Sequence, residues 1–236
     1  MDHISDEVRP GPLSRQPAPA DRAASANAAG SARVVRDTYA LLAMTLIFSA
    51  ACAGAGMALN LPAPGILLTL GGYFGLLFAV HRFKESGWAL PAVFALTGFM
   101  GYTLAPLLTK TLALAGGAQV LTLALAATGV TFLALSAWVL TTRRDFSFMG
   151  GFLFAGMVIA LLAGLAAIWL QIPALGLAMA AMVALLSAGL ILYETSRIVN
   201  GGETNCVMAT VGLYVSIFNL FTSLLSLFGF GSSEES

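Results

Sequence analysis

The stretch FSFMGGFLFAGMVIALLAGLAAIWLQIPALGLAMAAMVALLSAGLILY (residues 146–193) contains no Asp, Glu, Lys or Arg. Its clearest interruption is Gln171-Ile172-Pro173, a turn signal near the middle of the stretch. A helix that faces water does not continue so long without charge, whereas a membrane-spanning helix needs about 20 apolar residues to cross roughly 30 Å of hydrocarbon. The stretch therefore predicts two membrane-spanning helices joined by a tight turn.

The rest of the chain repeats this pattern on both sides. Hydrophobic residues make up 58% of the 236 residues and charged residues only 9%, against about 25% charged residues in soluble domains. Backbone polar groups in lipid must be satisfied within the segment, and no ten-residue alternation typical of a β-barrel is visible, so the runs are predicted to be helices. The sequence predicts an all-α membrane protein with seven transmembrane helices, at 38–59, 64–81, 87–107, 117–140, 147–170, 174–193 and 207–229.

The two ends differ from this core. Residues 1–35 are rich in Pro, Ala, Ser and Gly and carry mixed charge, so we predict a disordered N-terminal tail. The seven-helix domain is expected over 36–230, followed by a short C-terminal tail at 231–236. The last apolar run is polar enough that a re-entrant hairpin is an alternative to a full crossing.

The placement of Lys and Arg predicts the orientation. With the N-terminus in the cytoplasm, ten of the eleven basic residues fall on the inner side and only Lys110 falls outside. Seven crossings then place the C-terminus on the far side of the membrane. The ten are Arg9, Arg15, Arg22, Arg33, Arg36, Arg82, Lys84, Arg143, Arg144 and Arg197.

Glu194 is the first residue considered for function, because it directly follows the long uncharged stretch. A carboxylate at the edge of the membrane is costly unless it is paired, hydrated or protonated, and such acids tend to mark ion or proton paths. Arg197 lies three residues on, so the competing interpretation is an ion pair that merely ends the helix.

Small and polar residues recur along the last run at steps of four, three, four and three. This spacing places them on one helical face, which is typical of a packing seam between membrane helices. The functional alternative is a narrow polar cavity reached by Glu194, in which the mid-span amide of Asn219 would need a partner. The stripe consists of Gly212, Ser216, Asn219, Ser223 and Ser226.

Other function classes find little support in the residues. The net charge is zero, which does not favour nucleic acid as a partner. Cys52 and Cys206 are interpreted as inert small hydrophobic residues. We find no catalytic constellation, metal-ligand spacing or phosphate-binding loop, so we expect neither an enzyme nor a cofactor or metal.

The segment YETSRIVNGGETNCVMATVGLYVSIFNLFTSLL (193–225) resembles the signature of the Bax inhibitor (transmembrane Bax inhibitor motif) family. FALTGFMGY (94–102) adds to the likeness, which extends over almost the whole chain after the tail and is strongest to the bacterial YccA-like branch. The resemblance implies a seven-helix fold in the bacterial inner membrane and a protein that binds and modulates the membrane protease FtsH in membrane protein quality control. It also implies that FtsH pulls on the flexible N-terminus, so the tail that holds Met1, Arg9 and Arg15 is a candidate handle.

The alternative function is a pH-sensitive calcium leak centred on Glu194. Other members of the family use two acidic residues for this, and the second position corresponds to Ser216, which cannot ionise. Hard cations prefer several charged oxygen ligands, so calcium is expected to bind weakly if it binds. We therefore expect Glu194 to be buried at the cytoplasmic side and hydrogen-bonded toward the last helix, as a helix-locking or pH-sensing residue.

Overall fold

The computed structural model describes residues 19–171 and 173–234, and these residues form seven α-helices and one short 3-10 helix. All seven α-helices are long and apolar enough to cross a membrane, which confirms the predicted fold class. The elements are α1 (Pro19–Ala58), α2 (Ile66–Phe83), α3 (Ala89–Leu112), α4 (Gly117–Thr142), η1 (Ser147–Met149), α5 (Gly150–Leu170), α6 (Pro173–Val199) and α7 (Cys206–Glu234).

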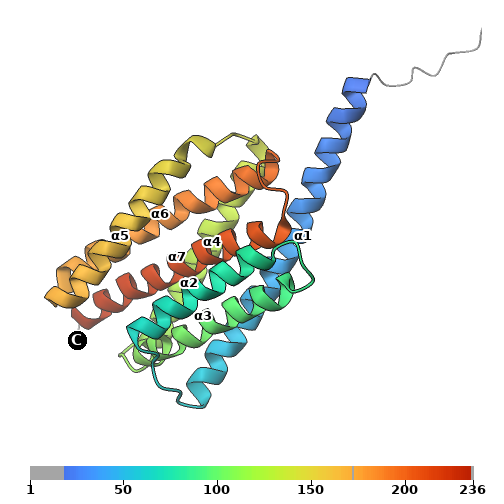
Figure 1. The fold of residues 1–236 in the computed structure, drawn as a ribbon. Coiled ribbons are helices and arrows are strands. Elements are labelled where there is room, and N and C mark those ends of the chain that lie inside the picture. The colour runs from blue at the N-terminus through green and yellow to red at the C-terminus, as the bar shows by residue number, and fades with distance from the viewer. Residues whose placement is uncertain (1–18, 172, 235–236) are drawn as a thin grey trace, which may run out of the picture.

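The centre of the bundle is α7, the most buried of the seven spans. It packs against α1, α3, α4 and α6, and Figure 1 shows α5 and α6 on one side of it and α2 and α3 on the other. The outer helices α2 and α5 have few neighbours: α2 packs on α3, and α5 packs on α6 and η1. Their outward faces carry large exposed apolar side chains such as Phe78 and Trp169, as expected of surfaces that meet lipid.

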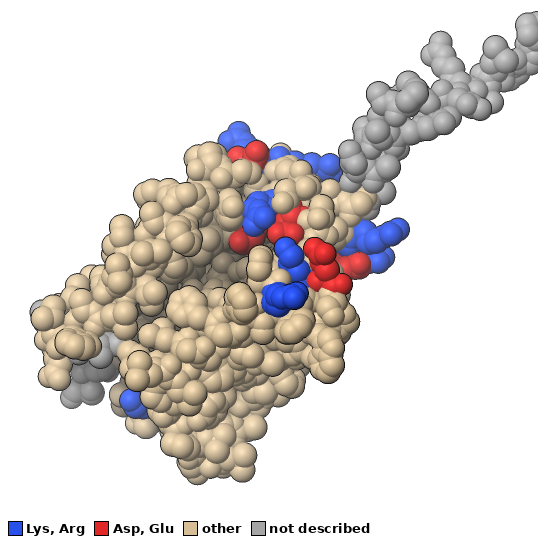
Figure 2. All heavy atoms as spheres, viewed as in Figure 1, with Lys and Arg blue, Asp and Glu red and all other residues tan. Residues whose placement is uncertain are grey.

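The charged residues gather at one end of the bundle, as the visible face in Figure 2 shows. The connections α2–α3, α4–η1 and α6–α7 meet there, because Asn205 Nδ2 donates a hydrogen bond to Lys84 O and Ser196 Oγ donates one to Arg144 O. Lys110 lies near the end of α3, which is the opposite end of the bundle. The alternation of the helices thus places Lys110 apart from the other described Lys and Arg residues, as the sequence pattern predicts.

The first helix differs from the expectation. We predicted a disordered segment over 1–35, whereas α1 begins at Pro19 and continues to Ala58. Alanine has the highest helix propensity, and the segment from Ala20 to Ala29 is rich in it. The helix therefore extends into the residues before the apolar span. Residues 1–18, with Met1, Arg9 and Arg15, lie outside the described residues, and their disorder stays a prediction.

The last helix is continuous. Its span from Cys206 to Phe230 is 25 residues long, which corresponds to about 37 Å at 1.5 Å per residue. A re-entrant hairpin would break the helix near its middle, so the structure favours the full crossing.

Candidate functional site

The site at the charged end is built on the last turns of α6. Glu194 and Arg197 lie three residues apart on one face of the helix, and Arg197 Nη1 is 3.6 Å from Glu194 Oε2. The side chains are 15% exposed for Glu194 and 30% for Arg197. The pair is therefore sheltered on the protein side of the helix, where a charge without a partner would be costly.

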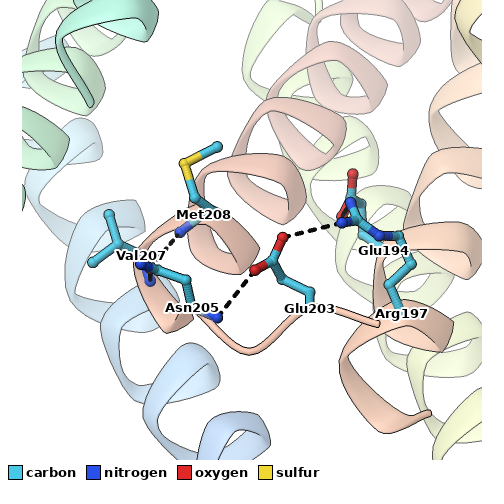
Figure 3. Close-up of polar contacts among 6 residues, drawn as sticks. All are labelled: Glu194, Arg197, Glu203, Asn205, Val207 and Met208. Carbon is cyan, nitrogen blue, oxygen red and sulfur yellow. Dashed lines mark hydrogen bonds and ion pairs between the residues drawn. The ribbon is translucent and has the colours of Figure 1, made fainter. Parts of the chain in front are cut away.

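A third charged residue, which the sequence analysis did not single out, completes this arrangement. Glu203 lies in the α6–α7 connection, and its Oε2 accepts a hydrogen bond of 3.1 Å from Arg197 Nη2. Arg197 thus lies between two carboxylates, and Figure 3 shows the three side chains converging from α6 and the connection. We call Glu194, Arg197 and Glu203 the ion-pair triad.

Asn205 connects the triad to the start of α7. Its Oδ1 accepts hydrogen bonds from the backbone N–H groups of Val207 (2.9 Å) and Met208 (3.3 Å), which is the bonding of a helix N-cap. Its own backbone N–H donates to Glu203 Oε1 at 3.0 Å (Figure 3). Its Nδ2 donates to Lys84 O at 3.1 Å. One amide side chain therefore holds the end of α2 and the beginning of α7 together.

Replacing Asn205 with alanine is expected to lower the free energy of unfolding by about 1–2 kcal/mol, because α7 loses its cap and Lys84 O loses a donor. Asn205→Ser retains an acceptor for the cap and should lose about half as much. Unfolding by SDS titration in mixed micelles measures both variants. Equal losses in the two variants would contradict the capping role.

The contact between Glu194 and α7 depends on Gly212. A Cβ atom at Gly212 would lie 2.8 Å from Glu194 Cδ and 3.0 Å from its Oε1. Glycine is therefore the residue that lets the carboxylate lie directly against the backbone of α7. We expected a hydrogen bond from Glu194 toward the last helix; among the described residues its polar partner is instead Arg197 on its own helix.

The other two residues singled out in α7 do not join the triad. Ser216 is buried, and its Oγ donates to Gly212 O at 2.9 Å within the helix. Asn219 is half-buried, and its backbone carbonyl accepts a hydrogen bond from the Thr222 hydroxyl. Ser223 is also buried. These positions fit the packing seam that the small-residue spacing favours.

Chemically, the triad is one guanidinium shared by two carboxylates. Arg197 also lies over the ring of Tyr193, with 5.6 Å from its Cζ to the ring centroid, a geometry typical of a cation–π contact. No group of three metal-ligating side chains occurs among the described residues. The geometry thus fits an ion-pair interaction that stabilises the α6–α7 connection against α6 better than it fits an open ion-binding site.

A cavity of about 790 Å³ lies beside the triad at the same end of the bundle. It lies between the start of the membrane span in α1, the end of α4 and the α6–α7 connection. Its lining includes Ser31, Val35, Arg143, Asn200 and Glu203. Ser31 and Val35 of α1 thus line the same cavity as Glu203 of the triad.

The chain is similar to known proteins over most of its length. A family model described as "Inhibitor of apoptosis-promoting Bax1" matches residues 31–233. Escherichia coli K12 has a relative named "Modulator of FtsH protease YccA", which is 50% identical over 202 residues, covering 86% of this chain and 92% of the relative. An uncharacterised Pseudomonas aeruginosa protein is 48% identical over 86% of this chain and 91% of its own length. A membrane protein of Vibrio cholerae is 41% identical over 86% and 92%.

Proposed function

Because this chain belongs to the Bax inhibitor family, we propose that it is a bacterial inner-membrane protein that binds and modulates the protease FtsH. The observation that carries this proposal is the 50% identity to the Escherichia coli modulator over 92% of the modulator's length. Another Escherichia coli relative with the same identity is named an inner membrane protein. Neither name describes an enzyme, and we propose a regulatory role without catalysis.

The geometry of α1 supports a role for the N-terminus in this interaction. The span proper begins at Gly30, whereas the helix begins at Pro19, so eleven further residues extend it by about 16 Å. Figure 1 shows this part of α1 projecting beyond the rest of the bundle. A segment that leads away from the membrane can be reached by a large protease. We propose that the N-terminus lies in the cytoplasm, as the distribution of Lys and Arg predicts.

Removing residues 2–18 is expected to lengthen the half-life of the protein at least about fivefold in cells that contain FtsH, because an unfoldase needs an unstructured segment to begin on. A pulse–chase measurement in cells with and without FtsH tests this. The matched control replaces residues 2–18 by a Gly/Ser segment of equal length, which should restore rapid turnover. Unchanged turnover of the truncated protein would disprove the handle.

Binding to FtsH is tested separately from turnover. The full-length chain should co-purify from membranes with a proteolytically inactive FtsH, and the truncated chain should do so too if the bundle contributes to binding. Failure of the full-length chain to co-purify would disprove the modulator function. Loss of binding only on truncation would assign the contact to the N-terminal segment.

The alternative of a calcium leak centred on Glu194 has less structural support. The Glu194 carboxylate lies beside Arg197, which Glu203 also contacts. A divalent cation would therefore have to displace Arg197. Ser216, at the position of the family's second acid, directs its hydroxyl proton to its own helix. Two carboxylates that already share an arginine form a poor ligand set for calcium.

A further inference from the structure

Lys110 is the one charged residue in the last turn of α3 and in the connections at that end of the bundle. The α1–α2, α3–α4 and α5–α6 connections contain no Asp, Glu, Lys or Arg. Lys110 lies two residues before the end of the α3 span and is exposed. Among the described residues no carboxylate lies within ion-pair distance of its ammonium group. An ammonium group at this depth can reach the polar boundary of the bilayer.

Two pockets flank Lys110 between α3 and α7, and the first is also lined by the α1–α2 connection and the start of α2. The first, of about 310 Å³, extends from Lys110 to Thr103 on α3 and to Phe218 on α7. The second, of about 290 Å³, extends from Lys110 and Leu114 to Leu225 and Phe230. Leu107 and Lys110 line both pockets. The pockets together therefore follow one side of α7 from Phe218 to Phe230, with Lys110 between them.

The wall of the first pocket is held in place by hydrogen bonds. Tyr102 OH donates to Pro62 O at 2.7 Å, and Thr69 Oγ1 donates to Gly65 O at 3.2 Å. The bond from Tyr102 fixes the α1–α2 connection against α3, and the bond from Thr69 fixes the end of that connection to the first turn of α2. The pocket thus has a defined wall where that connection meets α3.

Lys110 is the only charged residue that lines the two pockets, and the hydroxyl groups beside it already use their protons. Thr103, Thr111, Thr222 and Ser226 each donate to a carbonyl of their own helix. Their oxygen lone pairs can still accept hydrogen bonds. A ligand that fits must therefore bring a negative group for Lys110, and it can add hydroxyl donors for the threonine oxygens.

The depth of the pockets indicates the rest of the ligand. Phe218 is the midpoint of the span Cys206–Phe230, so the first pocket runs from the membrane boundary toward the middle of the bilayer. Lys110 and Thr103 are separated by about 10 Å along α3. An apolar groove at this depth is filled by hydrocarbon, and the molecule that joins hydrocarbon to a negative group in this environment is an anionic phospholipid.

We propose that Lys110 and the α3–α7 grooves bind an anionic phospholipid of phosphatidylglycerol type. Its phosphate contacts Lys110 Nζ, its headgroup hydroxyls donate to threonine oxygens, and one acyl chain lies along α3 and α7 toward Phe218. Zwitterionic phosphatidylcholine has the same phosphate and chains but carries a cation that Lys110 repels. This site is at the end of the bundle opposite the triad and does not depend on the interaction with FtsH.

A photocrosslinking experiment tests the site directly. Leu107 is replaced by benzoylphenylalanine in the full chain, which is reconstituted in vesicles of phosphatidylcholine with one fifth phosphatidylglycerol. Mass spectrometry of the crosslinked protein gives the ratio of the two lipids. We expect phosphatidylglycerol to be enriched over its bulk fraction about three- to fivefold, the effect of one basic residue on an anionic lipid.

The variants of Lys110 separate charge from fold. Lys110→Gln should return the crosslinked ratio to the bulk ratio, and Lys110→Arg should keep the enrichment. Lys84→Gln, at the charged end, is the matched control and should leave the ratio unchanged. A bulk ratio in the wild type, or enrichment that survives Lys110→Gln, would overturn the proposal.

One further occupant is tested in the same way. Glu234 and Glu235 follow the span of α7, and this acidic segment is the competing occupant of Lys110. Truncation after Ser233 should leave the enrichment unchanged. Enrichment that appears only after truncation would show that the terminus occupies Lys110 in the intact protein, and it would overturn the proposal for the intact protein.

Discussion

Replacing Arg197 with alanine is expected to lower the free energy of unfolding by about 2–3 kcal/mol, because it leaves two sheltered carboxylates without their shared cation. A fully buried pair would lose more, but Arg197 is 30% exposed and water screens part of the effect. The variant also loses the contact between Arg197 and the ring of Tyr193. Unfolding by SDS titration in mixed micelles gives the difference from the wild type.

Two control variants separate the triad from ordinary surface charge. Arg36→Ala removes an ion pair of 3.0 Å whose partners are 77% and 45% exposed, and it should cost less than about 1 kcal/mol. Arg197→Ala combined with Glu203→Gln should be more stable than Arg197→Ala alone, because one uncompensated carboxylate is removed. Equal losses for Arg197→Ala and Arg36→Ala would show that the triad does not stabilise the bundle.

Replacing Gly101 with alanine is expected to cost about 2–3 kcal/mol, because the added methyl group overpacks the contact between α1 and α3. Its Cβ would collide with the backbone carbonyl of Ser49 and would lie 2.9 Å from Ser49 Oγ. That hydroxyl is hydrogen-bonded to Tyr214 OH at 2.6 Å, and Tyr214 OH also donates to Thr97 O at 3.3 Å. The methyl group would therefore disturb the point where α1, α3 and α7 meet.

The matched control for this variant is Gly54→Ala on α1. A Cβ at Gly54 would meet nothing within 4 Å, so the substitution should be neutral or stabilise the helix by up to about 1 kcal/mol. The same SDS titration compares the two. A loss in Gly101→Ala no larger than that in Gly54→Ala would mean that α1 can shift away from α3 without cost.

The seven helices could be predicted because a segment that crosses lipid must be a long run of apolar residues without charge. A charge-free run bounded by a Pro or Gly turn or by a charged loop has few alternatives in a bilayer. The start of α1 could not be placed in this way, since residues 19–29 leave the apolar run and helix formation there depends on alanine propensity. Polar composition was interpreted as disorder, and the structure extends the helix instead.

The candidate site was predicted only as far as helical spacing allows. Glu194 and Arg197 share one helix, so their pairing follows from a separation of three residues. Glu203 and Asn205 lie in a connection whose path no periodicity describes, and Gly212 faces Glu194 only because of the register in which α6 packs on α7. The Asn at the start of the last apolar run was the one available signal, since Asn is a preferred N-cap.

The position of α1 gives the bundle a particular mechanical weakness. Leu42 belongs to the main core cluster and Ala53 to a second one, and α1 packs on α3, α6 and α7. A force applied to the N-terminus would first withdraw the helix that these two clusters share. We expect resistance to rise to a single maximum and then collapse, so that extraction from the N-terminal side proceeds through one cooperative rupture, without stable partly extracted states.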